Sequence, residues 1–202
     1  MACNHKFIRD LDLSYADWSV ETLVVGTFNP EWSRSNNADW FYGRRTNNFW
    51  NVLPRIYLEN ELICSDKQTK LDFCRKHRIG ITDLIKTINT ASQEEHFNII
   101  SSFSDKAIED NFKNDITQVN IIEILENKKT IRNVYLTRSA KNGMWRNLWK
   151  DIKSFCIDHE IYCTELLTPS NYAMYQYNKT EKQKYGSLED FIYGRWKEKW
   201  KK

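Results

Sequence analysis

The stretch that decides the fold is Glu21-Thr22-Leu23-Val24-Val25-Gly26-Thr27-Phe28-Asn29-Pro30. A short apolar run that ends in glycine and then in Asn-Pro is typical of a buried parallel strand that enters a loop. Gly26 permits a tight exit from the strand, and Asn29-Pro30 holds a rigid turn that can project an amide side chain into a cleft. The same pattern also suits a plain turn, so the stretch alone leaves both interpretations open.

Similar apolar runs recur along the chain and predict further strands at residues 78–84, 133–137 and 160–167. Helical spacing of apolar residues predicts helices at 46–58, at 105–126 with a break near Asn114, around Trp145 and Trp149, and at 187–200. Strands that alternate with helices require a parallel sheet covered on both faces, so we expect an α/β fold, a three-layer α/β/α sandwich. Neither a repeat nor a linker-like stretch interrupts residues 1–202, which predicts a single domain.

The composition narrows the class of protein. With 41% apolar, 14% aromatic and 28% charged residues, the chain is neither collagen-like nor intrinsically disordered. Its longest apolar runs are far shorter than the ~20 residues that a bilayer requires, and its first residues show no signal-peptide pattern, so we expect a cytoplasmic protein without membrane contact. The five cysteines and four histidines have no metal-binding spacing, which predicts reduced thiols and no metal.

Charge is distributed unevenly along the chain, although the net charge is only +3. Residues 128–153 carry eight basic side chains and one acidic one, whereas residues 93–126 are predominantly acidic. Segregation of this kind favours one face that meets a polyanion, although amphipathic helices with solvated charges give the same pattern. Because loops beyond the carboxyl ends of parallel strands share one rim, we expect residues 27–32, 137–142 and 168–172 to lie together.

A second informative segment is Tyr42-Gly43-Arg44-Arg45-Thr46-Asn47-Asn48-Phe49-Trp50. This segment resembles one in the uracil-DNA glycosylase superfamily through its Tyr-Gly, Asn47 and Phe-Trp. The resemblance is greatest to the hypoxanthine-DNA glycosylase group, and the mismatch-specific thymine/uracil glycosylases come second. Residues 80–85 resemble the second-strand segment of that family, and residues 167–171 resemble its late Pro-Ser loop. The resemblance implies a four-stranded parallel sheet of order 2-1-3-4, base excision from DNA without a cofactor, and a monomer bound to DNA.

The resemblance offers two asparagines for the role of positioning the attacking water. Asn47 aligns without a gap with the hypoxanthine group, and Asn29 lies one residue beyond the G-x-N-P motif of the mismatch-specific group. An amide oxygen can orient a water molecule, but it has essentially no proton affinity at neutral pH and is not a general base. Asn47 equally suits the N-cap of the following helix.

A glycosylase extrudes its target nucleotide from the duplex and reads the base by stacking and hydrogen bonds. The implied base-binding residues are Gly26, Thr27, Phe28, Tyr42 and Thr137. The implied DNA-binding residues are Arg44, Arg45, Arg138, Lys141, Pro169, Ser170, Asn171 and Tyr172. Phe28 is either a stacking platform for the base or a residue of the core. Pro169-Ser170 is either a DNA contact or a plain turn, and Tyr172 is a possible wedge into the base stack.

The chain departs from the family pattern at residues that bear on catalysis, so a function without catalysis is also possible. Thr168 stands where many members carry a histidine that stabilises the departing base, and Arg44-Arg45 replace a His-Pro pair. A catalytically silent member that only binds DNA, as a damage or phage-DNA sensor, is therefore the alternative to a DNA glycosylase. A nucleotide-processing enzyme is disfavoured because the chain has no glycine-rich phosphate-binding motif.

Overall fold

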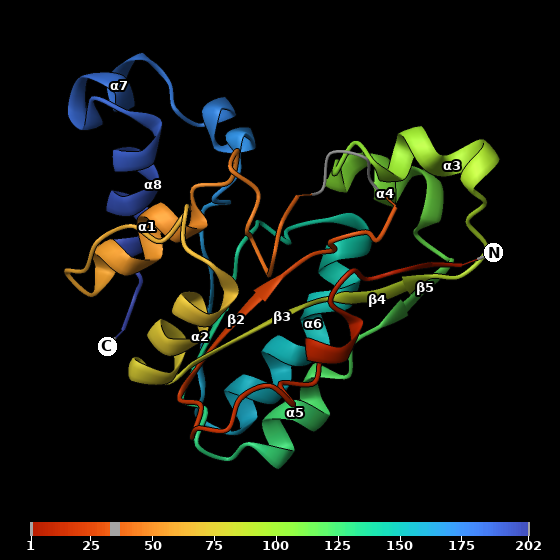
Figure 1. Ribbon diagram of the computed structural model, residues 1–202, viewed down its shortest axis with the longest axis horizontal. Helices are drawn as coiled ribbons and strands as arrows, with labels where there is room; N and C mark the ends of the chain where they lie inside the picture. Colours follow the sequence, from red (N-terminus) through yellow and green to blue (C-terminus); the bar gives the residue numbers. More distant parts are fainter. Residues whose placement is uncertain (1, 33–36, 202) are drawn as a thin grey trace.

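A four-stranded parallel sheet forms the centre of the computed structural model, which describes residues 2–32 and 37–201. Its strands are β2 (Thr22–Gly26), β3 (Ile79–Asp83), β6 (Asn133–Leu136) and β7 (Tyr162–Glu165). They lie in the order β3-β2-β6-β7, which is the expected order 2-1-3-4 (Figure 1). The predicted sheet is confirmed, and β2 and β3 are buried along their whole length, as strands covered on both faces should be.

Two hydrophobic clusters cover the two faces of this sheet. On β2, Leu23 and Val25 belong to one cluster and Val24 belongs to the other, because successive side chains of a strand point to opposite faces. The first cluster includes side chains of α4 (Asp105–Phe112), α5 (Ile121–Asn127) and α6 (Gly143–Asp158). The second, rich in aromatic residues, includes side chains of α1 (Phe49–Ile56), α2 (Lys67–Lys76) and α8 (Leu188–Lys197). The molecule is thus the expected three-layer sandwich (Figure 1).

A second, antiparallel sheet was not predicted from the sequence. It consists of β1 (Cys3–Asn4), β4 (Ile85–Ile88) and β5 (Ile116–Gln118), in the order β1-β4-β5. The break expected near Asn114 in the helical segment 105–126 is confirmed, since α4 ends at Phe112, but the strand β5 that separates α4 from α5 was not expected. A strand of three residues is too short to show alternating hydrophobicity, and only its pairing with β4 reveals it.

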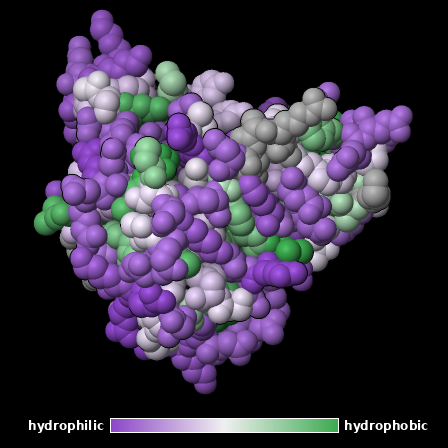
Figure 2. All heavy atoms as spheres, viewed as in Figure 1, coloured by the Kyte–Doolittle hydropathy of each residue, from purple (hydrophilic) through white to green (hydrophobic). Residues whose placement is uncertain are grey.

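The remaining elements lie outside the central sheet. They are the helices α3 (Gln93–Ile100) and α7 (Lys179–Tyr185) and the 3₁₀ turns η1 (Ile8–Asp10) and η2 (Asn171–Tyr175). Charged and polar side chains cover most of the face in Figure 2, and apolar side chains appear there in small separate groups. Within the described part of the chain, each helix is too short or too polar to cross a bilayer.

Candidate functional site

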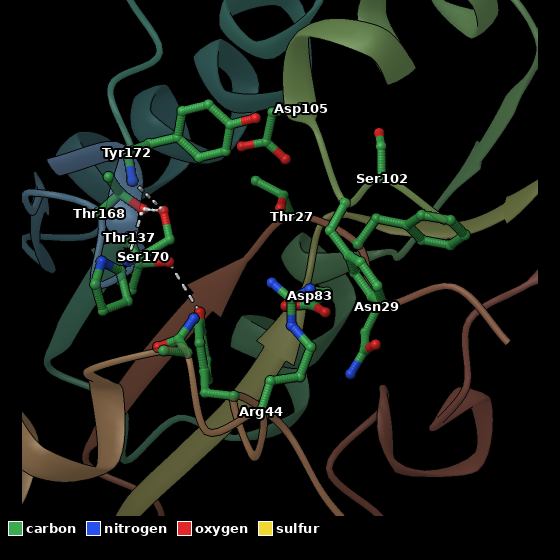
Figure 3. A pocket seen from close by; sticks show the side chains of 15 residues that line it. Thr27, Asn29, Arg44, Asp83, Ser102, Asp105, Thr137, Thr168, Ser170 and Tyr172 are labelled. Atoms are coloured by element: carbon green, nitrogen blue, oxygen red, sulfur yellow. Dashed lines mark hydrogen bonds between the residues drawn. The ribbon is translucent and has the colours of Figure 1, made fainter. Parts of the chain in front are cut away.

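A pocket of about 150 Å³ opens at the carboxyl ends of the parallel strands. Loops that follow β2, β6 and β7 meet there with the segment before α1 and the start of α4, and Figure 3 shows their side chains around a common space. The lining residues are Thr27, Phe28, Asn29, Tyr42, Arg44, Asn47, Asp83, Ser102, Phe103, Asp105, Thr137, Thr168, Pro169, Ser170 and Tyr172. The loops expected to share one rim thus contribute to one site, as the topology of a parallel sheet requires.

Both candidate asparagines line this pocket. The backbone of Asn47 forms an antiparallel bridge with Ser170, which joins the segment before α1 to the loop after β7. The Asn47 side-chain oxygen accepts a hydrogen bond from the backbone N–H of Phe49 at 2.9 Å. The N-cap of α1 is Asn48 and not Asn47, so the alternative interpretation is off by one residue; the Asn47 side chain holds the turn just before the helix, and its amide oxygen retains one lone pair for another partner.

Of the five residues expected to bind a base, Thr27, Phe28, Tyr42 and Thr137 line the pocket, and Gly26 does not. The Tyr42 ring stacks on Phe49, with ring centroids 3.9 Å apart and planes 4° apart, and its hydroxyl contacts the Thr137 hydroxyl at 2.9 Å. Thr27 and Phe28 line the wall, and Phe28 also packs against the hydrophobic core, so both of its interpretations describe part of its environment. Gly26 lies behind the lining, where a Cβ atom would overlap the Tyr42 hydroxyl.

Only some of the residues expected to bind DNA line the pocket. Pro169, Ser170 and Tyr172 line the pocket, whereas Asn171 and Arg45 are exposed outside it. Tyr172 lies at the mouth of the pocket and is 51% exposed as a residue.

The two other predicted arginines have specific neighbours. Arg44 lines the pocket with its guanidinium 3.7 Å from the centre of the Phe103 ring. Arg138 forms an ion pair with Asp105 at 2.8 Å and lies 4.0 Å from the Trp145 ring. Its charge is thus already balanced within the protein.

An adjoining cleft of about 560 Å³ shares Asp105, Thr168, Ser170 and Tyr172 with the pocket. Lys141, another predicted DNA contact, lines this cleft and is exposed. Its other charged side chains have both signs; they are Lys106, Arg138, Glu165, Arg195, Glu198 and Lys199. The cleft therefore continues the pocket across a surface of mixed charge.

Two pocket carboxylates were missed by the sequence analysis. Asp83, at the end of β3, is 5% exposed and accepts a hydrogen bond from His5 at 2.6 Å. Its position at the carboxyl end of a predicted strand was a signal that could have found it. Asp105 is the first residue of α4, in the long segment between β3 and β6, and nothing in the sequence relates that helix to the pocket.

The surroundings of Asp105 favour its protonated form more than water does. Burial raises the pKa of its carboxyl group, and the charges of Asp83 and Glu109 add to this effect, although 38% of the side chain remains exposed. Arg138 and the Thr27 hydroxyl act in the opposite direction and only partly compensate. A carboxylate of this kind, at the mouth of a polar pocket, is a candidate for a functional role.

Residues 2–32 and 37–201 contain no cluster of three or more histidine, cysteine, aspartate or glutamate side chains that could hold a metal ion. The polar groups that line the pocket are hydroxyls, amides, two carboxylates and one guanidinium. These groups can hydrogen-bond a small planar molecule. The rings of Phe28, Tyr42 and Phe103 also line the pocket, although Phe49 covers one face of Tyr42 and Arg44 covers one face of Phe103.

No protein-family model and no curated protein matches this chain. Among solved structures, the chain is similar to the solution NMR structure of a protein from Methanosarcina acetivorans that is provisionally described as a uracil DNA glycosylase. The similarity covers 88% of this chain and 92% of that chain, with a TM-score of 0.50 and 19% sequence identity. At this identity the comparison shows that the two chains share a fold.

Proposed function

We propose that this protein is a DNA glycosylase that everts a deaminated or otherwise modified base and hydrolyses its N-glycosidic bond. The observation that carries the proposal is the convergence of Asn29 and Asn47 on one pocket at the carboxyl ends of the sheet. These asparagines lie far apart from Thr137 and Ser170 in the sequence, yet all four line the same space. The description of the structural neighbour as a uracil DNA glycosylase supports the same reaction class.

The chemistry needs a positioned water and compensation of two developing charges. Cleavage of the glycosidic bond passes through an oxocarbenium-like sugar, which a nearby negative charge stabilises. In the proposed mechanism Asn47 orients the water, with Asn29 as the alternative, and the Asp105 carboxylate stabilises the sugar cation at the mouth. Arg44 is the cation that lines the pocket, and it stabilises the negative charge that develops on the departing base. No cofactor is required.

The everted base enters between the aromatic side chains of the pocket, and the duplex contacts the mouth. Phe28 is the proposed stacking platform, and the half-exposed Tyr172 is the proposed wedge that fills the space left in the base stack. Ser170, Pro169 and Asn171 contact the backbone near the everted nucleotide. Arg45 and Lys141 are exposed cations that would neutralise phosphates, and the protein acts as a monomer.

The test is an oligonucleotide panel that carries uracil, hypoxanthine, xanthine and modified cytosines in single and double strands, followed by alkaline cleavage of abasic sites. We expect product from at least one base, and a rate at least about 100-fold lower in Asn47→Ala, because loss of one group that acts on the transition state costs ~10²–10³-fold. Asn111→Ala is the matched control, since this exposed asparagine donates a hydrogen bond within its own helix and does not line the pocket. Absence of product from every substrate would contradict the proposal.

A catalytically silent DNA-binding protein is the second candidate. It is favoured because the Asn47 oxygen already accepts the Phe49 N–H, and because Thr168 brings no charge to the pocket. This candidate predicts salt-dependent DNA binding that is unchanged in the Asn29→Ala, Asn47→Ala double variant, with no abasic product from either protein.

A further inference from the structure

The inner end of the pocket is formed by three neighbouring strand ends. Gly26 and Asp83 are paired residues at the ends of β2 and β3, and Thr137 directly follows β6. A Cβ atom on Gly26 would overlap both Oδ1 of Asp83 and the hydroxyl oxygen of Tyr42. These two oxygens therefore lie side by side over the glycine, and we call them, with Thr137, the floor of the pocket.

Hydrogen bonds determine which groups at the floor can donate. The backbone N–H of Phe7 donates to Nδ1 of His5 at 3.0 Å, so the proton of a neutral His5 ring is on Nε2. That Nε2–H donates to Oδ2 of Asp83 at 2.6 Å. Within residues 2–32 and 37–201, Oδ1 of Asp83 has no hydrogen-bond partner, although the side chain is only 7% exposed. This oxygen is open to the pocket, so it can accept a hydrogen bond from a donor group of a molecule bound there.

The Tyr42 hydroxyl directs its hydrogen away from Asp83. The Thr137 hydroxyl contacts the Val25 carbonyl oxygen at 3.3 Å, and a carbonyl can only accept. Because each hydroxyl has one hydrogen, both contacts of Thr137 are hydrogen bonds only if Thr137 donates to Val25 and Tyr42 donates to Thr137. Burial, and then the charge of Asp83, raise the pKa of Tyr42 well above its usual value, so the phenol keeps its hydrogen. The floor thus presents two acceptor oxygens and no donor.

An exocyclic amino group matches this floor. Its two hydrogens can reach both Oδ1 of Asp83 and the Tyr42 oxygen, whereas a carbonyl oxygen in the same place would face two sets of lone pairs. A cavity of ~150 Å³ holds a benzene-sized ring, which corresponds to one pyrimidine. Arg44, elsewhere on the lining, can donate to the ring acceptors that such a base also carries.

We propose that the pocket takes a pyrimidine with a 4-amino group, that is, a cytosine or substituted cytosine, and that Asp83, oriented by His5, determines this specificity. The inference rests on the proposed glycosylase function and narrows its substrate class. It excludes the deaminated pyrimidines as preferred substrates, because they present a carbonyl where the floor accepts hydrogen bonds.

The experiment compares matched pairs of oligonucleotides that differ only in amino or carbonyl at C4. The pairs are cytosine and uracil, 5-methylcytosine and thymine, and 5-hydroxymethylcytosine and 5-hydroxymethyluracil. Single-turnover excision and equilibrium binding are both measured. We expect the amino member to be favoured by about 10- to 100-fold, the usual discrimination from one pair of base-edge hydrogen bonds.

Two variants identify the groups responsible. Asp83→Asn replaces a carboxylate with an amide that can donate to a carbonyl, so the preference should reverse towards the C4-carbonyl bases. Tyr42→Phe removes the second acceptor while keeping the ring stacked on Phe49, so the preference should decrease without loss of fold. Asp110→Asn, an exposed substitution on α4, is the matched control and should leave the ratio unchanged. Thermal unfolding checks that each variant is folded.

The outcomes separate this inference from the proposed function. Excision of the carbonyl members in preference, or an unchanged ratio in folded Asp83→Asn, would overturn the inference and leave the glycosylase proposal in place. If no base is excised, the glycosylase proposal fails, and the binding measurements decide the inference instead. Equal affinities for the two members of each pair would then overturn it.

Discussion

The floor and the mouth of the pocket are built in different ways. At the floor, Asp83 and Thr137 are at most 5% exposed and lie at the ends of β3 and β6, the two strands that flank β2, so the sheet register holds their positions. At the mouth, the Tyr172 residue is 51% exposed, and the side chain of Asp105 is 38% exposed; they come from a 3₁₀ turn and the first turn of a helix. Under the proposed function, we therefore expect the floor to discriminate between small ligands by fixed hydrogen bonds and the mouth to act by charge and surface contact.

The most severe way to break this arrangement is to alter the floor with Gly26→Ala. The added methyl group would overlap Asp83 and Tyr42, and displacing one reacting group alone costs ~100-fold in rate. Because both floor oxygens must shift, we expect excision to fall by about 1,000-fold or more, and overpacking should lower the free energy of unfolding by about 1–3 kcal/mol. Single-turnover kinetics and urea unfolding measure the two effects.

Gly186→Ala is the control for this substitution. A Cβ atom there meets nothing within 4 Å, but the residue has a φ of +64°, which costs a non-glycine residue ~1–2 kcal/mol. We expect a comparable loss of stability with unchanged excision. A similar loss of activity in both variants would show that stability, and not the floor, limits the reaction.

At the mouth, Asp105→Asn should lower the excision rate because it removes a negative charge. We expect the excision rate to fall by about 100-fold, because the amide cannot stabilise the sugar cation. In the wild type the rate should decline as the pH falls through the raised pKa of Asp105, that is, at a higher pH than for an ordinary aspartate, because protonation removes the charge. The asparagine variant should lack this decline. If the decline of the excision rate at low pH persisted in Asp105→Asn, another titrating group would be responsible for it.

The raised pKa of Asp105 also makes the free energy of unfolding depend on pH. This dependence is opposite in direction to that of the excision rate, and comparison with Asp105→Asn isolates it. The folded state holds the Asp105 proton more tightly than the unfolded state does, so this group stabilises the fold at low pH. That contribution is lost as the pH rises from about 3.8 through the raised pKa of the folded state. Compared with Asp105→Asn, the wild type should therefore lose unfolding free energy over this window, which urea titrations at several pH values would measure.

We expect a smaller effect, on DNA affinity, from removing the exposed aromatic side chain of Tyr172 at the mouth. Tyr172→Ala should weaken binding to an abasic-site duplex by about 10-fold, since stacking on one base contributes ~1–3 kcal/mol. Tyr175→Ala is a matched control: Tyr175 is 86% exposed, and its ring lies 6.1 Å from that of Tyr172, but it is not a lining residue of the pocket. Fluorescence anisotropy measures both, and equal losses would contradict a specific wedge.

The smallest expected effect concerns a single cation of the adjoining cleft. Lys141→Gln should reduce the slope of log K against log salt by about 1, as for the loss of one phosphate contact. Lys106→Gln is the control, because Lys106 lines the same cleft but is paired with Asp110 at 2.7 Å. A salt slope that changes equally in both variants would show that the cleft attracts DNA only through its total charge.

Local patterns in the sequence predicted the sheet and part of the pocket. The run ending at Gly26 was identified from its own residues and the segment around Asn47 from its resemblance to a known family, and the structure brings Asn29 and Asn47 to one space. His5 was not assigned a role, because its partner Asp83 is 78 positions away and no local pattern relates them. The β1-β4-β5 sheet was missed for a similar reason, since strands of two to four residues acquire their identity only from pairing.

The sequence by itself determined the alternation of strands and helices, because hydrophobic periodicity and turn residues are properties of short segments. It also placed the polar loops on one rim, since parallel strands all end at the same edge. Only the tertiary structure decided which polar groups share the pocket and which way their hydrogen bonds point. The open oxygen of Asp83 depends on His5, Tyr42 and Thr137 at once, and such directions follow from the three-dimensional arrangement of donors and acceptors.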